Sequence, residues 1–227
     1  MKRRIIVISL GGSMIIPDEV NSNFLEKFKK IINKNTKNYK FILVTGGGSL
    51  ARKYISALKN NSYKIQSTAG IAATRANAKF VSVYFNQDPE QVIPTTMKKL
   101  KKLIKKQDIA ICGALGYKVK QTTDSTACEI AAYFNTIFIN ITNVQGLYDK
   151  NPQKFKNAKF ISEISWEDFY KMVNKFAFKP GQHFPLDQTS AKIIRDNKIP
   201  AYIFGLDLKN LDNFLNNKKF KGTTISR

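Results

Sequence analysis

The stretch FILVTGGGSLAR, residues 41–52, joins four apolar residues to three glycines and then to a segment with helical spacing. Leu50, Tyr54 and Leu58 recur every four residues, which is typical of one apolar face of a helix. The stretch therefore predicts a buried strand, a glycine turn and the start of a helix. Glycine lets the backbone approach a ligand closely, and the first amides of a helix are free, so such a turn suits a phosphate group. A tight turn without a ligand is the alternative that this stretch alone leaves open.

Similar patterns recur along the chain. Apolar runs at 5–10, 109–112 and 137–141 lead into Gly11-Gly12-Ser13, into Gly113 and into the polar segment 142–148. Helical spacing predicts helices over about 22–34, 70–85, 98–106, 165–175 and 187–196, with others after Leu50 and after one of the residues 122–124. We expect a polar loop at 149–157 and two last strands near 202–204 and 223–225.

This alternation of short apolar strands with helices predicts an α/β fold, in which a mostly parallel sheet is covered on both faces. Ligands of such sheets bind at the carboxyl ends of the strands. The glycine and polar loops all follow strands, so we expect them to converge on one cleft. With 227 residues and no linker or repeat, residues 1–227 are expected to form a single domain.

The chain is strongly basic, with a formal net charge of +22 and no acidic residue between Lys27 and Gln87. Such charge suits anionic partners, but the excess is nearly all lysine spread along the chain, so we favour a compositional bias over a nucleic-acid surface. The lysine-rich segment 98–106 fits an amphipathic helix with a solvated face. No apolar run has the length of a membrane helix, and we expect a cytoplasmic protein with no membrane partner. Cys112 and Cys128 have no metal-type spacing and are expected to be reduced and structural.

Several common chemistries lack support. The sequence has no P-loop motif. Gly46, Gly48 and Ala51 fit a dinucleotide fingerprint, but the acidic residue that should follow about 20 positions later is missing. His183 is the only histidine and has no recognisable partner for a hydrolase triad.

Phosphoryl transfer is favoured by the glycine loops, the scattered cations and the few acids, because positioning and charge neutralisation do most of the work in that reaction. Asp124 and Asp187 each begin a predicted helix beside a loop. Either could orient donors or hold Mg2+ at a phosphate cleft, and plain N-capping is the alternative for both.

Taken in order, five segments resemble the amino-acid-kinase superfamily and, within it, the archaeal type of uridylate kinase: 11–13, 46–52, 74–78, 122–124 and 141–148. Asp187 with Ala191-Lys192-Ile193-Ile194, and the closing segment 222–225, extend the resemblance over essentially the whole chain. It implies a three-layer αβα sandwich, ATP-dependent phosphorylation of UMP to UDP with Mg2+, and a homo-hexamer.

The resemblance also implies roles for single residues. Asp124, Asp187 and Arg52 match positions at the reacting phosphates. Positions on the ATP side are matched by Gly12, Ser13, Gly48, Arg52, Thr142, Asn143, Tyr148 and Asn151. Positions that contact UMP are matched by Gly47, Ser67, Thr122 and Thr123.

The chain departs from the family pattern at several of these places. Ser9 stands where many members have a phosphate-binding lysine, Ser67 where an aspartate holds the ribose, and Asn151 and Gln145 where aspartates are usual. The loop before Thr122 is about two residues longer than the pattern and carries Lys118 and Lys120, which could touch an acceptor phosphate.

Two alternatives to a UMP kinase remain open from the sequence. One is a superfamily relative that phosphorylates another small phosphate or acidic acceptor, such as isopentenyl phosphate. The other is a non-catalytic regulator, derived from the kinase, that binds anions or nucleic acid. Phosphotransfer to nucleoside monophosphates would separate these readings.

Overall fold

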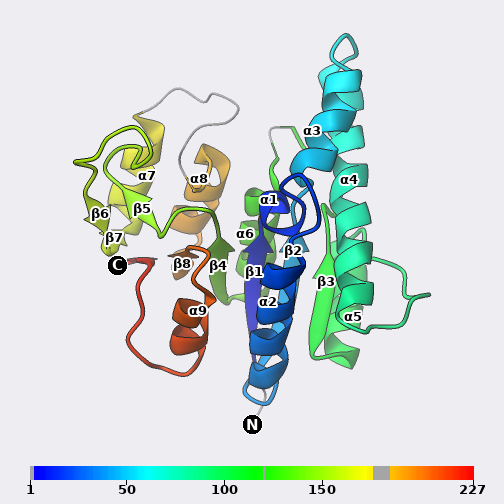
Figure 1. The fold of residues 1–227 in the computed structure, drawn as a ribbon, viewed down its shortest axis with the longest axis horizontal. Helices are drawn as coiled ribbons and strands as arrows, with labels where there is room; N and C mark the ends of the chain where they lie inside the picture. Colours follow the sequence, from blue (N-terminus) through cyan, green and yellow to red (C-terminus); the bar gives the residue numbers. More distant parts are fainter. Residues whose placement is uncertain (1–2, 120, 176–184) are drawn as a thin grey trace.

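The computed structural model describes residues 3–119, 121–175 and 185–227. Its central sheet has seven strands in the order β3-β2-β1-β4-β8-β9-β7, and neighbours are parallel except β8 and β9 (Figure 1). The strands are β1 Arg4–Leu10, β2 Tyr39–Thr45, β3 Ile109–Cys112, β4 Ile137–Ile141, β7 Glu163–Ser165, β8 Ala201–Phe204 and β9 Thr223–Ser226. The predicted mostly parallel sheet is thus confirmed.

Helices cover both faces of this sheet. Four pack on one face: α1 Gly12–Ile15, α2 Ser22–Asn35, α4 Tyr63–Tyr84 and α9 Leu208–Leu215. Four others pack on the opposite face: α5 Met97–Lys106, α6 Thr123–Phe134, α7 Trp166–Asn174 and α8 Gln188–Asp196. The remaining helix, α3 Gly48–Ala57, packs against α4, and together they project beyond the rest of the molecule at the top right of Figure 1. The expected three-layer arrangement is therefore present.

Alternation along each strand separates the two cores. In β1, Ile6, Ile8 and Leu10 enter the core beneath α2, whereas Val7 enters the core beneath α6. Because Ser9 follows the same alternation as Val7, its hydroxyl faces α6 at the carboxyl end of the strand. The fold thus places one buried polar group where the chain leaves the sheet.

Sequence reasoning missed several short elements. The polar loop predicted after Tyr148 is closed by an antiparallel hairpin of β5 Leu147–Tyr148 and β6 Phe160–Ile161. Neither β7 nor α9 was expected, and α4 begins at Tyr63 rather than near residue 70. Strands of two or three residues show no period, and the polar first turns of α4 lack apolar spacing, so neither leaves a clear sequence signal.

Other expectations agree with the structure. The lysine-rich helix α5 buries Leu100 and Ile104 while its lysines lie outside, and Thr96 caps it. Cys112 and Cys128 are free and buried. Among the described residues, no helix is both long and apolar enough to cross a membrane.

Candidate active site at the carboxyl ends of the strands

Two glycine turns meet at the centre of the candidate site. A β-carbon on Gly12 would lie 2.0 Å from the backbone nitrogen of Gly48, and one on Gly46 would lie 2.4 Å from the nitrogen of Gly12. Gly48 has a φ of +58°, which strains any other residue type. The turns after β1 and β2 are therefore in direct backbone contact, and side chains are excluded between them.

The helices that begin at these two turns lack the caps that the others have. Neither α1 nor α3 receives a side-chain hydrogen bond at its N-terminus. Each of the other seven helices in the described residues has a capping side chain, from Asn21, Ser62, Thr96, Thr122, Ser165, Asp187 and Asp207. The first backbone N–H groups of α1 and α3 thus remain available to an anionic ligand.

Residues of α4 support the glycine turn after β2 and the loop after β3 through hydrogen bonds. Asn77 Nδ2 donates to the carbonyl of Gly46 at 2.7 Å, and Thr45 Oγ1 donates to the carbonyl of Thr74 at 2.9 Å. The Ala114 N–H donates to Thr74 Oγ1 at 3.0 Å, which ties the loop after β3 to the same helix. Segment 74–78 was recognised only as part of a family pattern, and these bonds show that it supports the two loops after β2 and β3.

Asp124 lies on the first turn of α6 and is reached from β1. Ser9 Oγ donates to Asp124 Oδ1 at 2.6 Å, and Ser9 is fully buried. The pKa of Asp124 is raised to about 7, mainly by burial. The Ser9 hydrogen bond partly offsets this rise, and the nearby Asp187 carboxylate adds to it. Ser9, which stands where the family pattern has a lysine, is thus a neutral hydrogen-bond partner of the Asp124 carboxyl group.

Asp187 joins α8 to α6. Its side chain caps α8 by accepting from Ser190 N at 2.8 Å, and it also accepts a hydrogen bond from the Thr122 hydroxyl. Thr122 is itself the N-cap of α6, in a capping box with Ser125. Asp187 is therefore an N-cap, and it lies close enough to Asp124 to raise its pKa, while a role in orienting donors or holding Mg2+ stays a prediction.

The residues expected to contact an acceptor are brought together. Gly47, Ser67, Thr122 and Thr123 all line one cavity of about 330 Å3 between α3, α4 and the loop after β3. Lys118 also lines it, but its Nζ pairs with Glu129 Oε2 of α6 at 2.7 Å. Lys118 is therefore held by a carboxylate rather than left free for an acceptor phosphate, and Lys120 lies outside the described residues.

Four of the expected ATP-side residues lie in the loop and hairpin after β4: Thr142, Asn143, Tyr148 and Asn151. Thr142 donates its N–H to the carbonyl of Phe204 at 2.9 Å, and the Tyr148 ring packs edge-on against Phe160. Asn151 Oδ1 accepts from Gln153 N at 2.9 Å, while its Nδ2 is buried without a partner. Thr223 fastens the hairpin to the sheet, because its hydroxyl accepts from Leu147 N and donates to the carbonyl of Ile161.

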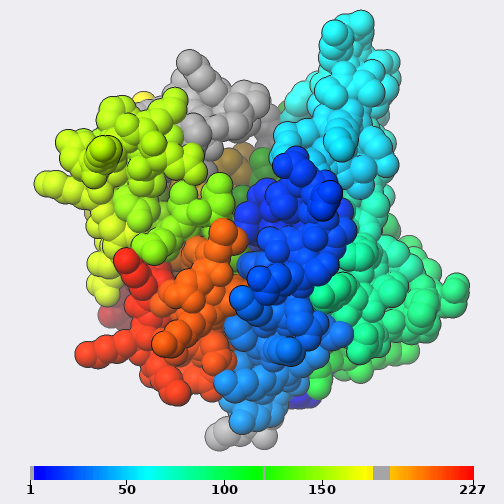
Figure 2. All heavy atoms as spheres, in the orientation of Figure 1, coloured from blue at the N-terminus to red at the C-terminus, as the bar shows by residue number. Residues whose placement is uncertain are grey.

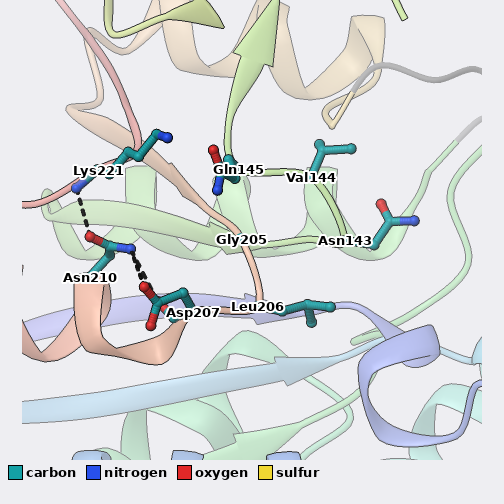
Figure 3. A pocket seen from close by; sticks show the side chains of 8 residues that line it. All are labelled: Asn143, Val144, Gln145, Gly205, Leu206, Asp207, Asn210 and Lys221. Carbon is teal, nitrogen blue, oxygen red and sulfur yellow. Dashed lines mark hydrogen bonds between the residues drawn. The ribbon is translucent and has the colours of Figure 1, made fainter. Parts of the chain in front are cut away.

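Asn143 borders a separate small pocket of about 170 Å3 (Figure 3). In this view Asn143, Val144 and Gln145 lie across from Leu206 and Asp207 of the β8–α9 connection. No other residue expected at the site lines this pocket. Asn143 is therefore placed near the glycine turns only through the chain, because it follows Thr142, the first residue after β4.

Arg52 and Ser13 take no part in these hydrogen bonds. Both are exposed, and neither side chain makes a hydrogen bond or ion pair with another described residue. Figure 2 shows the surface hollowed above α1, between the cyan α3–α4 projection and the yellow-green β5–α7 part of the chain. His183 and the turn 179–182 lie outside the described residues.

These features define a class: an α/β protein that presents two uncapped, glycine-based helix starts and a pair of carboxyl groups at one sheet edge. The amino acid kinase family model matches residues 4–205, and the chain belongs to that family.

Within the family, the chain is similar to uridylate kinases. That of Thermoplasma volcanium is 33% identical over 224 residues, which covers 97% of this chain and 96% of the relative. That of Thermococcus sibiricus is 32% identical over 207 residues, covering 89% and 90%. The crystal structure of uridylate kinase from Archaeoglobus fulgidus matches with a TM-score of 0.84 at 28% identity, covering 97% of this chain and 99% of that one.

Proposed function

We propose that this chain is a uridylate kinase that transfers the terminal phosphoryl group of ATP to UMP. The observation that carries the proposal is the contact between two uncapped helix starts, next to a cavity lined by Gly47, Thr122 and Thr123. Similarity to uridylate kinases over nearly the full length supports the acceptor. No feature of the described residues favours isopentenyl phosphate or a role without catalysis.

The backbone would do most of the binding of the donor phosphates. The N–H groups at Gly12, Ser13 and Gly48 lie at helix starts without side-chain caps, and oriented amides of this kind stabilise phosphate charge without reorganising. Thr142, Asn143, Tyr148 and Asn151 would hold the rest of the ATP. Arg52, exposed and unpaired among the described residues, is free to turn toward the phosphates.

Mg2+ fits this site as an ion that enters bound to the phosphates of the nucleotide. The described residues contain no group of three or more His, Cys, Asp or Glu side chains able to hold a metal. Ser9, Thr122, Asp124 and Asp187 offer oxygen atoms, which Mg2+ prefers, and this ion commonly keeps its waters and binds substrate phosphates. Asp124 and Asp187 would accept hydrogen bonds from those waters. The ion would neutralise charge on the transferred group.

The acceptor needs no general base. The second pKa of a phosphate monoester is about 6, so an oxygen of UMP is already ionised at neutral pH. That oxygen forms a bond to the γ-phosphorus of ATP as the bond to the β-phosphate oxygen breaks, and ADP leaves. Asp124, whose carboxyl group accepts a hydrogen bond from Ser9, would orient the groups that donate hydrogen bonds to the phosphates in this in-line arrangement. It would not remove a proton.

A screen of nucleoside monophosphates with ATP and Mg2+ tests the proposal. We expect UDP to form from UMP at the highest kcat/KM, measured by chromatography of the products. Absence of turnover with every pyrimidine monophosphate would refute it. Isopentenyl phosphate belongs in the same screen, because its phosphorylation would identify a different member of the family.

The hexamer, the cytoplasmic location and the absence of nucleic acid as a partner stay predictions. Light scattering after size-exclusion chromatography measures the assembly directly. Binding of single-stranded RNA that falls steeply with salt, without phosphotransfer, would favour the regulator instead.

A further inference from the structure

The cavity that lies against Gly47 is almost free of charge. Of its described lining residues, Lys118 alone is charged, and no carboxylate lines the cavity. The acidic side chains that hydrogen-bond to lining residues are not themselves part of the lining. Glu129 accepts from Lys118 and from Gln121, and Asp187 accepts from Thr122. An acceptor in this cavity therefore meets neutral groups, apart from one lysine that is already paired.

Most polar side chains of the lining are also engaged. Gln66 Nε2 donates to the carbonyls of Lys59 and Asn61, and Thr126 Oγ1 donates to the carbonyl of Thr122. Thr74 Oγ1 donates to the carbonyl of Ile71 and accepts from Ala114.

Four hydroxyl groups of the described lining have no hydrogen-bond partner in the protein: those of Tyr63, Ser67, Tyr117 and Thr123. These are the unpaired hydroxyl groups that the cavity can offer a ligand.

Their positions divide the cavity. Thr123 adjoins Asp124 at the start of α6, so it lies at the end where phosphoryl transfer would occur. Tyr63 and Tyr117 lie at the outer end and are exposed, with 56% and 36% of their surface accessible. Ser67 is half-buried on α4, one helical turn from Tyr63. A nucleotide with its phosphate at Gly47 and its base outward would therefore set its sugar beside Ser67.

We propose that this acceptor site binds the sugar through neutral hydroxyl groups, chiefly that of Ser67. It therefore accepts both ribonucleoside and 2′-deoxyribonucleoside monophosphates. The inference rests on the proposed function and specifies its substrate class. It does not depend on the exact pose, because no described lining residue can offer a carboxylate to a 2′-hydroxyl. A neutral hydrogen bond discriminates by about tenfold or less, whereas a charge-assisted one reaches about a hundredfold.

Calorimetric titration of the protein with UMP and with dUMP, in the presence of a non-hydrolysable ATP analogue and Mg2+, tests this. We expect the two dissociation constants to agree within about tenfold, and kcat/KM to follow the same ratio. Ser67→Asp should introduce a charged hydrogen-bond acceptor and raise the preference for UMP over dUMP at least tenfold. Asparagine has nearly the shape of aspartate but no charge, so Ser67→Asn should leave that preference within about threefold of the wild type.

The two proposals fail in different ways. If UMP binds more than about tenfold tighter than dUMP in the wild type, or if Ser67→Asp and Ser67→Asn behave alike, the inference about the sugar is wrong while the kinase stands. If neither nucleotide binds and neither is phosphorylated, the proposed function itself is wrong. Thermal unfolding of both variants checks that the fold is kept, which we expect at this half-buried helix position.

Discussion

The glycine centre, formed by Gly12, Gly46 and Gly48 with Asp124 and its partners, differs sharply from the acceptor cavity beside it. In the centre, backbone meets backbone with no room for a β-carbon, and Ser9, Asn77 and Thr45 have their hydrogen bonds made. In the cavity, four hydroxyl groups have no partner in the protein and two tyrosines are exposed.

This difference matches the two tasks of a phosphotransferase. Phosphoryl groups have one shape and one charge, so a frame whose side chains are bonded can hold its free backbone N–H groups in fixed positions around them. Acceptors differ in sugar and base, and unused hydrogen-bonding capacity is what a cavity needs to take them. Substitutions in the centre should therefore cost far more than substitutions in the cavity.

Gly12→Ala should have the largest effect. The new methyl group would lie 2.0 Å from the Gly48 nitrogen, so the two turns must separate by more than 1 Å. A misplacement of about 1 Å costs roughly 10²-fold, so we expect kcat/KM to fall by at least about 10²-fold. The overpacking should lower stability by roughly 2–3 kcal/mol, measured by urea unfolding.

Gly11→Ala is the matched control for stability. Its β-carbon would meet no atom closer than 3.5 Å, so the free energy of unfolding should stay within about 0.5 kcal/mol of the wild type. Equal destabilisation by both variants would contradict the close contact of the two turns.

Asp124→Asn should separate activity from stability. Losing the carboxylate that orients the phosphate donors should reduce kcat by about 10²-fold. The folded pKa of about 7 lies above the ordinary value of 3.8, so the folded state keeps a proton that the unfolded chain loses. Stability therefore falls as the pH rises from about 4 to about 7 and stays low above that.

The asparagine variant lacks this ionisation and should be the more stable protein at pH 8. The full shift corresponds to about 4 kcal/mol, and water reaching this partly exposed residue reduces the expected gain to roughly 2 kcal/mol. Denaturant unfolding at pH 5 and pH 8, without nucleotide or metal, measures it. A variant no more stable than the wild type at pH 8 would show that the carboxyl group is well solvated.

Arg52→Ala should have an intermediate effect confined to catalysis. The side chain is exposed and unpaired among the described residues, so the melting temperature should not change. Loss of one charge-assisted contact to phosphate should lower kcat/KM by roughly 30-fold. Lys53→Ala, on the neighbouring exposed position of α3, is the control and should retain activity. Unfolding of the Arg52 variant would mean that Arg52 is structural.

Lys118→Gln should have the smallest effect. Its ion pair with Glu129 is on the surface, with 62% of the lysine side chain exposed, and such pairs contribute about 0–1 kcal/mol. We expect KM for UMP to change by less than about threefold. Glu129→Gln releases the same lysine and sharpens the comparison. If it tightened UMP binding while Lys118→Gln weakened it tenfold, Lys118 would be a phosphate ligand after all.

Much of this site could be read from the chain because its signals are local. A run such as 41–44 followed by three glycines specifies a buried strand and a turn whatever surrounds it, and Thr122 caps α6 through residues three positions away. The hairpin of β5 and β6 is different. Its strands have two residues each and are held by Thr223, more than 60 residues downstream, so no local pattern could reveal them.

The sequence by itself determined most of the strands and helices, the glycine turns and the polar residues that follow the strands, since these depend on side-chain period and backbone freedom. Only the tertiary structure decided their partners. Ser9 reaches Asp124 across 115 positions, Asp187 reaches Thr122 across 65, and Lys118 turns to Glu129 instead of a phosphate. Such pairings depend on which loops the parallel sheet brings to one edge, and that follows from the packing of the whole chain.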